Sequence, residues 1–233
     1  DSVSFRNTKG VFSLTDNLFV GEEGRFDWSP AGLNPDEVYA NFKEYSFNVR
    51  KPELKSDLVM LNYTGKTPGF VAGRFEFRSQ PRKDSVASSY PRFTSYESNL
   101  EIKGVGTERM KYTGGFSLHG PLVKSSNVNG DLATLLVLDS IGNTKFKARS
   151  KEFLFKDSTV AADRSVFTIF QDNDSINHHA VRLRYDYSKE KVVVQGEKGN
   201  MRNTPFTATF FNMDFSANMI RWDLKTDTLD IYA

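Results

Sequence analysis

The histidines and the carboxylates close to them are the residues whose types could hold a metal ion. Asp172, Asp174 and His178 lie near one another in the sequence, and carboxylate and imidazole groups together suit divalent transition metals. The run 171–175 is equally typical of a polar turn, in which Asn and Asp side chains bond to nearby backbone groups. His178 and its neighbour His179 would point to opposite faces of a regular strand. We favour the turn, and expect no metal site and no cofactor.

Two short motifs resemble sites for phosphate binding and nucleophilic catalysis, but each lacks a required residue. Residues 65–67, Gly-Lys-Thr, match the end of a phosphate-binding loop, yet Met60 stands where the upstream glycine is needed. Residues 115–119, Gly-Phe-Ser-Leu-His, are similar to a nucleophile elbow, but His119 replaces the last glycine. We expect neither motif to supply a catalytic residue.

Acidic residues on or beside the expected strands could supply the two carboxylates that a glycan-processing enzyme needs. They are Glu22, Glu23, Asp27, Glu76 and Asp186. Nothing in their spacing singles out one pair, and solvated sheet faces account for them. We therefore predict that the chain is not an enzyme, and keep a glycan-processing domain as the second alternative.

Aromatic side chains are the most numerous candidates for ligand contact, with 20 Phe, nine Tyr and two Trp. Rings at strand spacing usually pack against an opposite sheet. They could instead stack on sugars or line a groove for an acyl chain. For a sugar platform, the candidates for exposed rings are Trp28, Tyr90 and Trp222.

Alternating side chains indicate the elements that would position these residues. Residues 181–187 alternate apolar and charged side chains, as half-buried strands do, and a second strand at 192–194 follows a polar turn. Residues 220–224 and 229–231 repeat this hairpin pattern. The sequence predicts an all-β fold of antiparallel, stacked hairpins, forming an elongated β-sandwich or jellyroll or a solenoid-like stack.

One segment carries the signals of a short helix. Asn34 suits the N-cap, Pro35 the first helical position, and Asp36 and Glu37 the first turn. The period of two resumes at Tyr45, so we expect this helix to end before that residue.

A weak internal repeat of about 55 residues runs through the chain. Five strand-like stretches open with Asp, Glu or Asn and carry a large apolar residue four positions later; they begin at residues 1, 57, 108, 163 and 218. This spacing favours stacked repeat units. We expect one elongated β-repeat region over 1–233, within a longer protein, with sub-units near 1–56, 57–107, 108–162 and 163–233.

Composition excludes several classes of function. The chain of 233 residues has no cysteine, which excludes disulfides and thiol catalysis. Its 31 basic and 29 acidic residues give a net charge of +2, which offers no electrostatic reason to expect nucleic acid as a partner. No apolar run approaches the ~18 residues of a transmembrane helix, so we expect no transmembrane segment.

The C-terminal third carries a recurring pattern of strands and turns. Residues 161–167, Ala-Ala-Asp-Arg-Ser-Val-Phe, match an alanine–aspartate element followed by alternating apolar residues. Residues 179–196 are similar to the next part of the repeat, a strand ending in Tyr-Asp, a polar turn and a Val-rich strand before Gly. Residues 217–231 repeat it with Trp-Asp. This pattern resembles the OstA-like β-jellyroll repeats of bacterial lipopolysaccharide transport. The resemblance covers residues 145–233, whereas 1–144 match loosely.

The resemblance implies stacked antiparallel strands around an apolar slot that holds acyl chains, with no catalytic residues. It implies acyl chains or glycolipids as partners, or other envelope proteins joined through edge strands. The location would be the bacterial cell envelope, in the periplasm or at the outer-membrane surface. The residues expected to line the slot are Phe153, Phe155, Phe167, Ile169, Leu183, Tyr185, Phe210 and Trp222.

Together these patterns predict a non-enzymatic structural or lipid-handling segment of a bacterial envelope protein. A carbohydrate-binding β-sandwich module is the first alternative.

Overall fold

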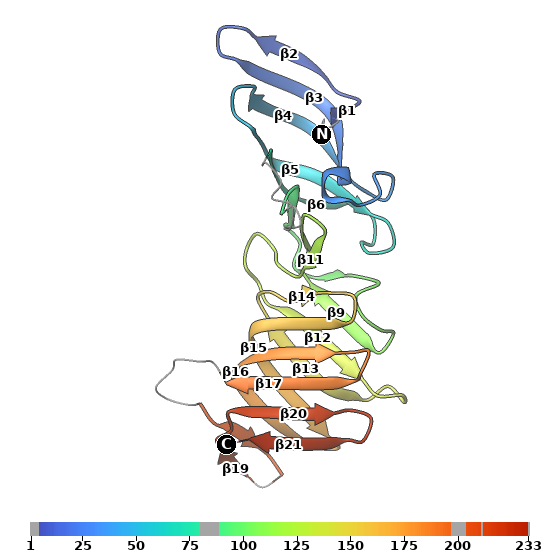
Figure 1. Ribbon diagram of the computed structural model, residues 1–233, viewed down its shortest axis with the longest axis vertical. Coiled ribbons are helices and arrows are strands. Elements are labelled where there is room, and N and C mark those ends of the chain that lie inside the picture. The colour runs from blue at the N-terminus through green and yellow to red at the C-terminus, as the bar shows by residue number, and fades with distance from the viewer. Residues whose placement is uncertain (1–4, 80–88, 197–203, 211, 233) are drawn as a thin grey trace. The chain divides into compact units, whose positions relative to one another are not determined.

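The structure is a computed structural model that describes residues 5–79, 89–196, 204–210 and 212–232 (Figure 1). These residues form an all-β fold of antiparallel strands, which confirms the predicted fold class. The described ranges contain one helix, the short 3₁₀ turn η1 (Ser29–Ala31). None of the described residues forms a helix with the length and apolar character needed to span a bilayer.

The chain divides into two compact units. Unit 1 comprises Asp1–Lys103 and Gly115–Gly130, and unit 2 comprises Gly104–Gly114 and Asp131–Ala233. Each unit therefore takes its strands from two stretches of sequence. The repeat sub-units expected near 1–56, 57–107, 108–162 and 163–233 stay a prediction.

Unit 1 is a curled antiparallel sheet in which β2 to β7 follow one another, then β10 and β11, with the short β1 beside β3. Because the sheet curls, Phe26 of β3 meets Phe75 of β6, with ring centroids 4.9 Å apart. The strands are β1 (Phe5–Arg6), β2 (Lys9–Ser13), β3 (Leu18–Asp27), β4 (Val38–Asn48), β5 (Glu53–Tyr63), β6 (Val71–Arg78), β7 (Arg92–Ser95), β8 (Leu100–Glu101), β10 (Ser117–His119) and β11 (Leu122–Lys124).

Unit 2 is built around one long hairpin, β15 and β16, to which the other strands are added. The predicted hairpins at 181–194 and 220–231 form as β16–β17 and β20–β21. The strands are β9 (Met110–Gly114), β12 (Ala133–Leu138), β13 (Thr144–Ser150), β14 (Leu154–Phe155), β15 (Thr159–Gln171), β16 (Asp174–Asp186), β17 (Lys191–Gly196), β18 (Phe206–Ala208), β19 (Met213–Phe215), β20 (Met219–Asp223) and β21 (Thr228–Tyr232).

The long hairpin bends, so each of its strands takes part in two layers. The first part of β15 pairs with β14 and its second part with β13, and the ladder shifts register between Ala162 and Ser165. Figure 1 shows β12 and β13 crossing behind β15 to β17. Phe146 of β13 meets Tyr185 of β16 and Trp222 of β20, at centroid distances of 5.3 and 6.3 Å. The two layers of unit 2 thus share a packed aromatic core.

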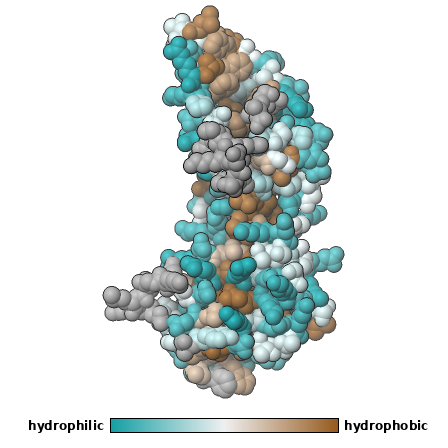
Figure 2. Space-filling view, viewed as in Figure 1, coloured by the Kyte–Doolittle hydropathy of each residue, from teal (hydrophilic) through white to brown (hydrophobic). Residues whose placement is uncertain are grey.

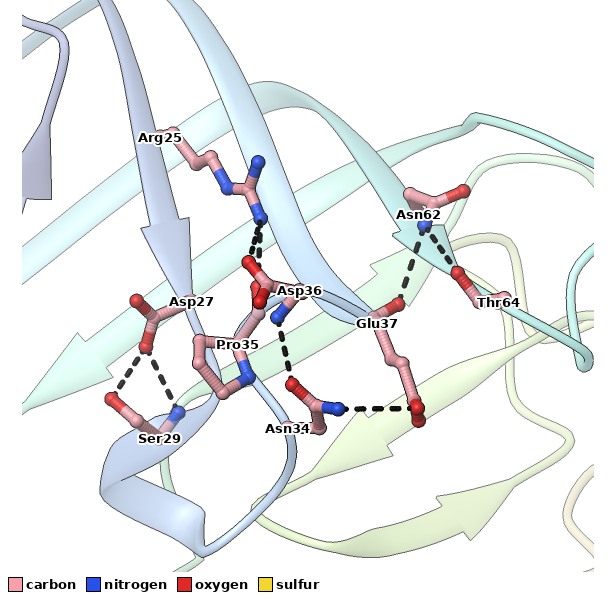
Figure 3. A network of polar contacts seen from close by, with 9 residues as sticks. All are labelled: Arg25, Asp27, Ser29, Asn34, Pro35, Asp36, Glu37, Asn62 and Thr64. Carbon is pink, nitrogen blue, oxygen red and sulfur yellow. Dashed lines mark hydrogen bonds and ion pairs between the residues drawn. The ribbon is translucent and has the colours of Figure 1, made fainter.

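The helix predicted from Asn34 is wrong, because the segment forms a turn that leads into β4 (Figure 3). Asn34 does act as a local cap, since its Oδ1 accepts the Asp36 N–H at 3.1 Å. From Val38 onward, Val38, Ala40 and Phe42 are buried in alternation while the strand pairs with both β3 and β5. Pairing with β3 and β5 places these three apolar side chains on one buried face of the sheet. Residues two apart would not share a face of a helix.

Candidate functional site: an aromatic groove in unit 1

An open groove of about 350 Å³ lies between β1, β3, β4, β5 and β6 of unit 1. We call it the aromatic groove, because six of its side chains are aromatic. The apolar lining consists of Phe5, Phe19, Phe26, Tyr45, Phe47, Leu54 and Phe77. Thr8, Lys51, Pro52, Glu53 and Ser79 complete it.

The alternation of the strands places these rings on one side of the sheet. Phe19 stands opposite Phe47 in the β3–β4 ladder, and Gly21 stands opposite Tyr45. Residues two apart on a strand share a face, so all four positions face the groove side while Val20 faces away. Figure 2 shows apolar side chains gathered over the β2–β3 end of unit 1.

Glycine at position 21 makes room for the Tyr45 ring. A Cβ added to Gly21 would lie 2.3 Å from the Tyr45 Cζ, well inside van der Waals contact. The Tyr45 hydroxyl is hydrogen-bonded to the Thr8 hydroxyl, and the Tyr45 ring lies 4.7 Å from that of Phe5. Burial raises the pKa of Tyr45, with the Thr8 hydrogen bond acting in the opposite direction, so the ring stays neutral at physiological pH.

The groove offers ring faces and methylene groups, with Lys51 and Glu53 as its charged lining residues. Phe19 and Phe47 are half-buried and Phe77 is likewise only partly covered, so apolar surface remains open to a ligand. Burying apolar area is worth about 25 cal/mol per Å². The site is therefore suited to hold an apolar chain by removing it from water.

Most residues expected to line a slot are packed inside unit 2. Phe153, Phe167 and Leu183 are fully buried, and Ile169, Tyr185 and Trp222 are nearly so. Phe155 is half-buried against Tyr112, with ring centroids 5.3 Å apart.

Phe210 differs from the other expected slot residues, because it is 70% exposed. It shares a separate hollow of about 390 Å³ with Ile169. The structure therefore brings Tyr185 and Trp222 together around Phe146, but places Phe210 apart from them.

The three expected sugar platforms are also covered. Trp28, Tyr90 and Trp222 are at most 6% exposed. The Trp28 ring packs against Phe75, and the Arg92 guanidinium lies over the Tyr90 ring, 4.4 Å from its centroid. None of the three presents the exposed ring face that stacking on a sugar requires.

Several of the residues considered for metal binding and catalysis are engaged in other contacts. In the part of the chain that the structure describes, no three His, Cys, Asp or Glu side chains gather as metal ligands. His178 is buried, whereas the Asp174 carboxylate accepts a hydrogen bond from Thr209 at 3.1 Å. Ser117 is buried within strand β10, where its hydroxyl accepts a hydrogen bond from Ser126. It does not stand at a strand-to-helix turn.

The aromatic groove was not predicted from the sequence, although the sequence carries a signal for it. Tyr45 and Phe47 carry the period of two that marks a strand, and Phe19 and Gly21 have the same spacing. The alternating pattern does not show whether another layer of the fold covers these rings. Comparison with known proteins adds no relative: no family model, curated protein or solved structure matches the chain.

Proposed function

We propose that this chain is a non-enzymatic, lipid-handling segment whose aromatic groove holds an acyl chain. The observation that carries the proposal is the set of partly exposed rings that line one open groove. Burying about six methylene groups there would contribute about 5 kcal/mol. The envelope setting comes from the resemblance to OstA-like repeats, and it is part of the same proposal.

The arrangement of the rings favours a flexible chain over a flat ligand. Phe19 and Phe47 are tilted by 41° to one another, and Phe26 and Phe77 by 49°. Tilted rings expose both faces and edges, which match methylene groups better than they match a planar sugar face. The tilted rings therefore support an acyl chain as the ligand of the groove.

Crosslinking to a photoreactive palmitic-acid analogue tests this assignment. We expect labelled peptides from β3 and β4, and at least tenfold less labelling in Phe19→Glu, because a carboxylate in the groove must be desolvated when the chain enters. Val20→Glu is the matched control, since Val20 is the next residue, faces away and is 48% exposed. Far-ultraviolet circular dichroism checks that both variants keep their strands. Undiminished labelling of a folded Phe19→Glu variant would falsify the groove as the lipid site.

A further inference from the structure

A second hollow, of about 510 Å³, lies in unit 2 at the bend of β15. The same edge of β15 pairs first with β14 and then with β13. Residues 151–153, which connect β13 to β14, do not pair with β15 and leave a gap along its edge. Opposite that gap, Asp163 and Arg164 form a bulge in which two residues of β15 face the single residue Arg182 of β16. The unpaired residues 151–153 and the bulge in β15 together open the hollow.

The hollow combines an apolar lining with basic side chains. Leu132, Leu154 and Val166 contribute apolar surface, and Arg149, Lys151 and Arg164 contribute positive charge. We call these three the basic cluster. In the residues that the structure describes, no side chain of the basic cluster makes an ion pair.

The carboxylates in the lining do not cancel this charge. Asp163 is engaged by Arg182, with the Nε and Oδ1 atoms 3.8 Å apart. Glu152 is the other acidic residue of the lining. The lining thus holds three basic and two acidic residues, and one of the acidic residues, Asp163, also pairs with Arg182. The hollow is therefore positive overall.

The equivalent bulge in unit 1 shows that the basic cluster is not needed to form a bulge. There Asp57 and Leu58 of β5 face the single residue Arg74 of β6, and Arg74 Nε lies 3.4 Å from Asp57 Oδ1. The aspartate–arginine pair is therefore common to both bulges. Leu58 stands where unit 2 has Arg164, so the added cation is specific to unit 2.

We infer that this hollow binds the oxyanion headgroup of an amphiphile, held by the basic cluster, while the start of its apolar chain contacts Leu132, Leu154 and Val166. Arginine presents a planar fork of donors that suits phosphate and carboxylate oxygens. The apolar lining adds a reason to prefer an amphiphile over a free anion. This site is separate from the aromatic groove and does not rest on it.

Titration of the ¹⁵N-labelled chain with monododecyl phosphate, below its micelle concentration, tests the inference. We expect chemical-shift changes in residues 149–152 and 163–166. The double variant Arg149→Gln/Arg164→Gln should bind at least tenfold more weakly. Lys147→Gln is the matched control, because Lys147 lies two residues before Arg149 on β13 but does not line the hollow. It should bind like the unaltered chain.

Two further ligands distinguish the source of the oxyanion. Inorganic phosphate should bind at least tenfold more weakly than monododecyl phosphate, and uncharged octyl glucoside should leave residues 149–152 unshifted. If inorganic phosphate bound as tightly as monododecyl phosphate, the preference for an amphiphile would be wrong. If the double variant bound monododecyl phosphate with unchanged affinity, the assignment of the headgroup to the basic cluster would be wrong. Phe19→Glu should leave these shifts intact, so failure of the aromatic groove and failure of this hollow give different results.

Discussion

His178 shows how one buried side chain joins two strands of unit 2. Its Nδ1 accepts the Ala180 N–H at 2.9 Å, so the ring hydrogen lies on Nε2 and is donated to the Thr204 carbonyl at 2.8 Å. The ring also lies 4.5 Å from that of Phe206 in β18. A second proton on Nδ1 would face the Ala180 N–H, so the neutral ring is the form that fits.

The fit of the neutral ring predicts a loss of stability at mildly acidic pH. Burial lowers the pKa of His178 below its usual 6.5; the Thr204 hydrogen bond raises it and the neighbouring His179 lowers it further. Because the unfolded chain then binds the proton more readily, this contribution is complete above pH 6.5 and is lost as pH falls from 6.5 towards the folded pKa. We expect urea unfolding of His178→Gln to depend less on pH across this window than that of the unaltered chain. An NMR titration that placed the His178 pKa at or above 6.5 would contradict this.

At the scale of elements, a bulge with the same aspartate–arginine pair occurs in both units. Asp57 and Asp163 open two of the five copies of the sequence repeat, and each stands at the bulge of its strand. An extra residue in one strand bends it and increases its twist. In unit 2 this bend carries β15 from its pairing with β14 to its pairing with β13. In these two copies, the acidic residue that opens the repeat stands at a β-bulge and pairs with an arginine of the neighbouring strand.

Deleting Arg164 tests the role of the bulge. Removing one of the two bulged residues restores a regular ladder and keeps Ala162 and Ser165 facing inward, but removes the bend. We expect the free energy of unfolding of unit 2 to fall by about 1–3 kcal/mol. Arg164→Ala keeps the bulge and should change stability by less than about 0.5 kcal/mol, because the side chain is exposed. Equal urea midpoints for the deletion and the substitution would show that the bend is not needed.

For the whole molecule, the division into two units predicts two separable cores. Leu61 of unit 1 and Leu183 of unit 2 are both fully buried. Truncating a buried leucine to alanine costs about 2–5 kcal/mol. We expect Leu61→Ala to lower hydrogen-exchange protection mainly in β4, β5 and β6, and Leu183→Ala mainly in β15, β16 and β17. Equal loss of protection in both units from either variant would mean that the chain unfolds as one body.

The sequence by itself determined the strands and several of their connections. Alternation from Val181 to Tyr187 and from Ile220 to Leu224 was enough to predict two hairpins, since a period of two suits only a half-buried strand. The helix expected to begin at Asn34 does not form, although the Asn34 side chain still accepts the Asp36 N–H within a turn. Capping is a contact within a few residues, whereas the choice of strand over helix depended on pairing with β3 and β5.

Only the tertiary structure decided which aromatic rings are open. Trp222 and Phe19 both lie on strands with alternating side chains, yet Trp222 is covered by Phe146 from the other layer of unit 2, whereas Phe19 lines an open groove. A strand's pattern specifies that one face is apolar, but exposure of that face depends on whether another layer packs on it. Covering layers come from distant parts of the chain, so local periodicity determined the strands, and long-range packing determined where a ligand could bind.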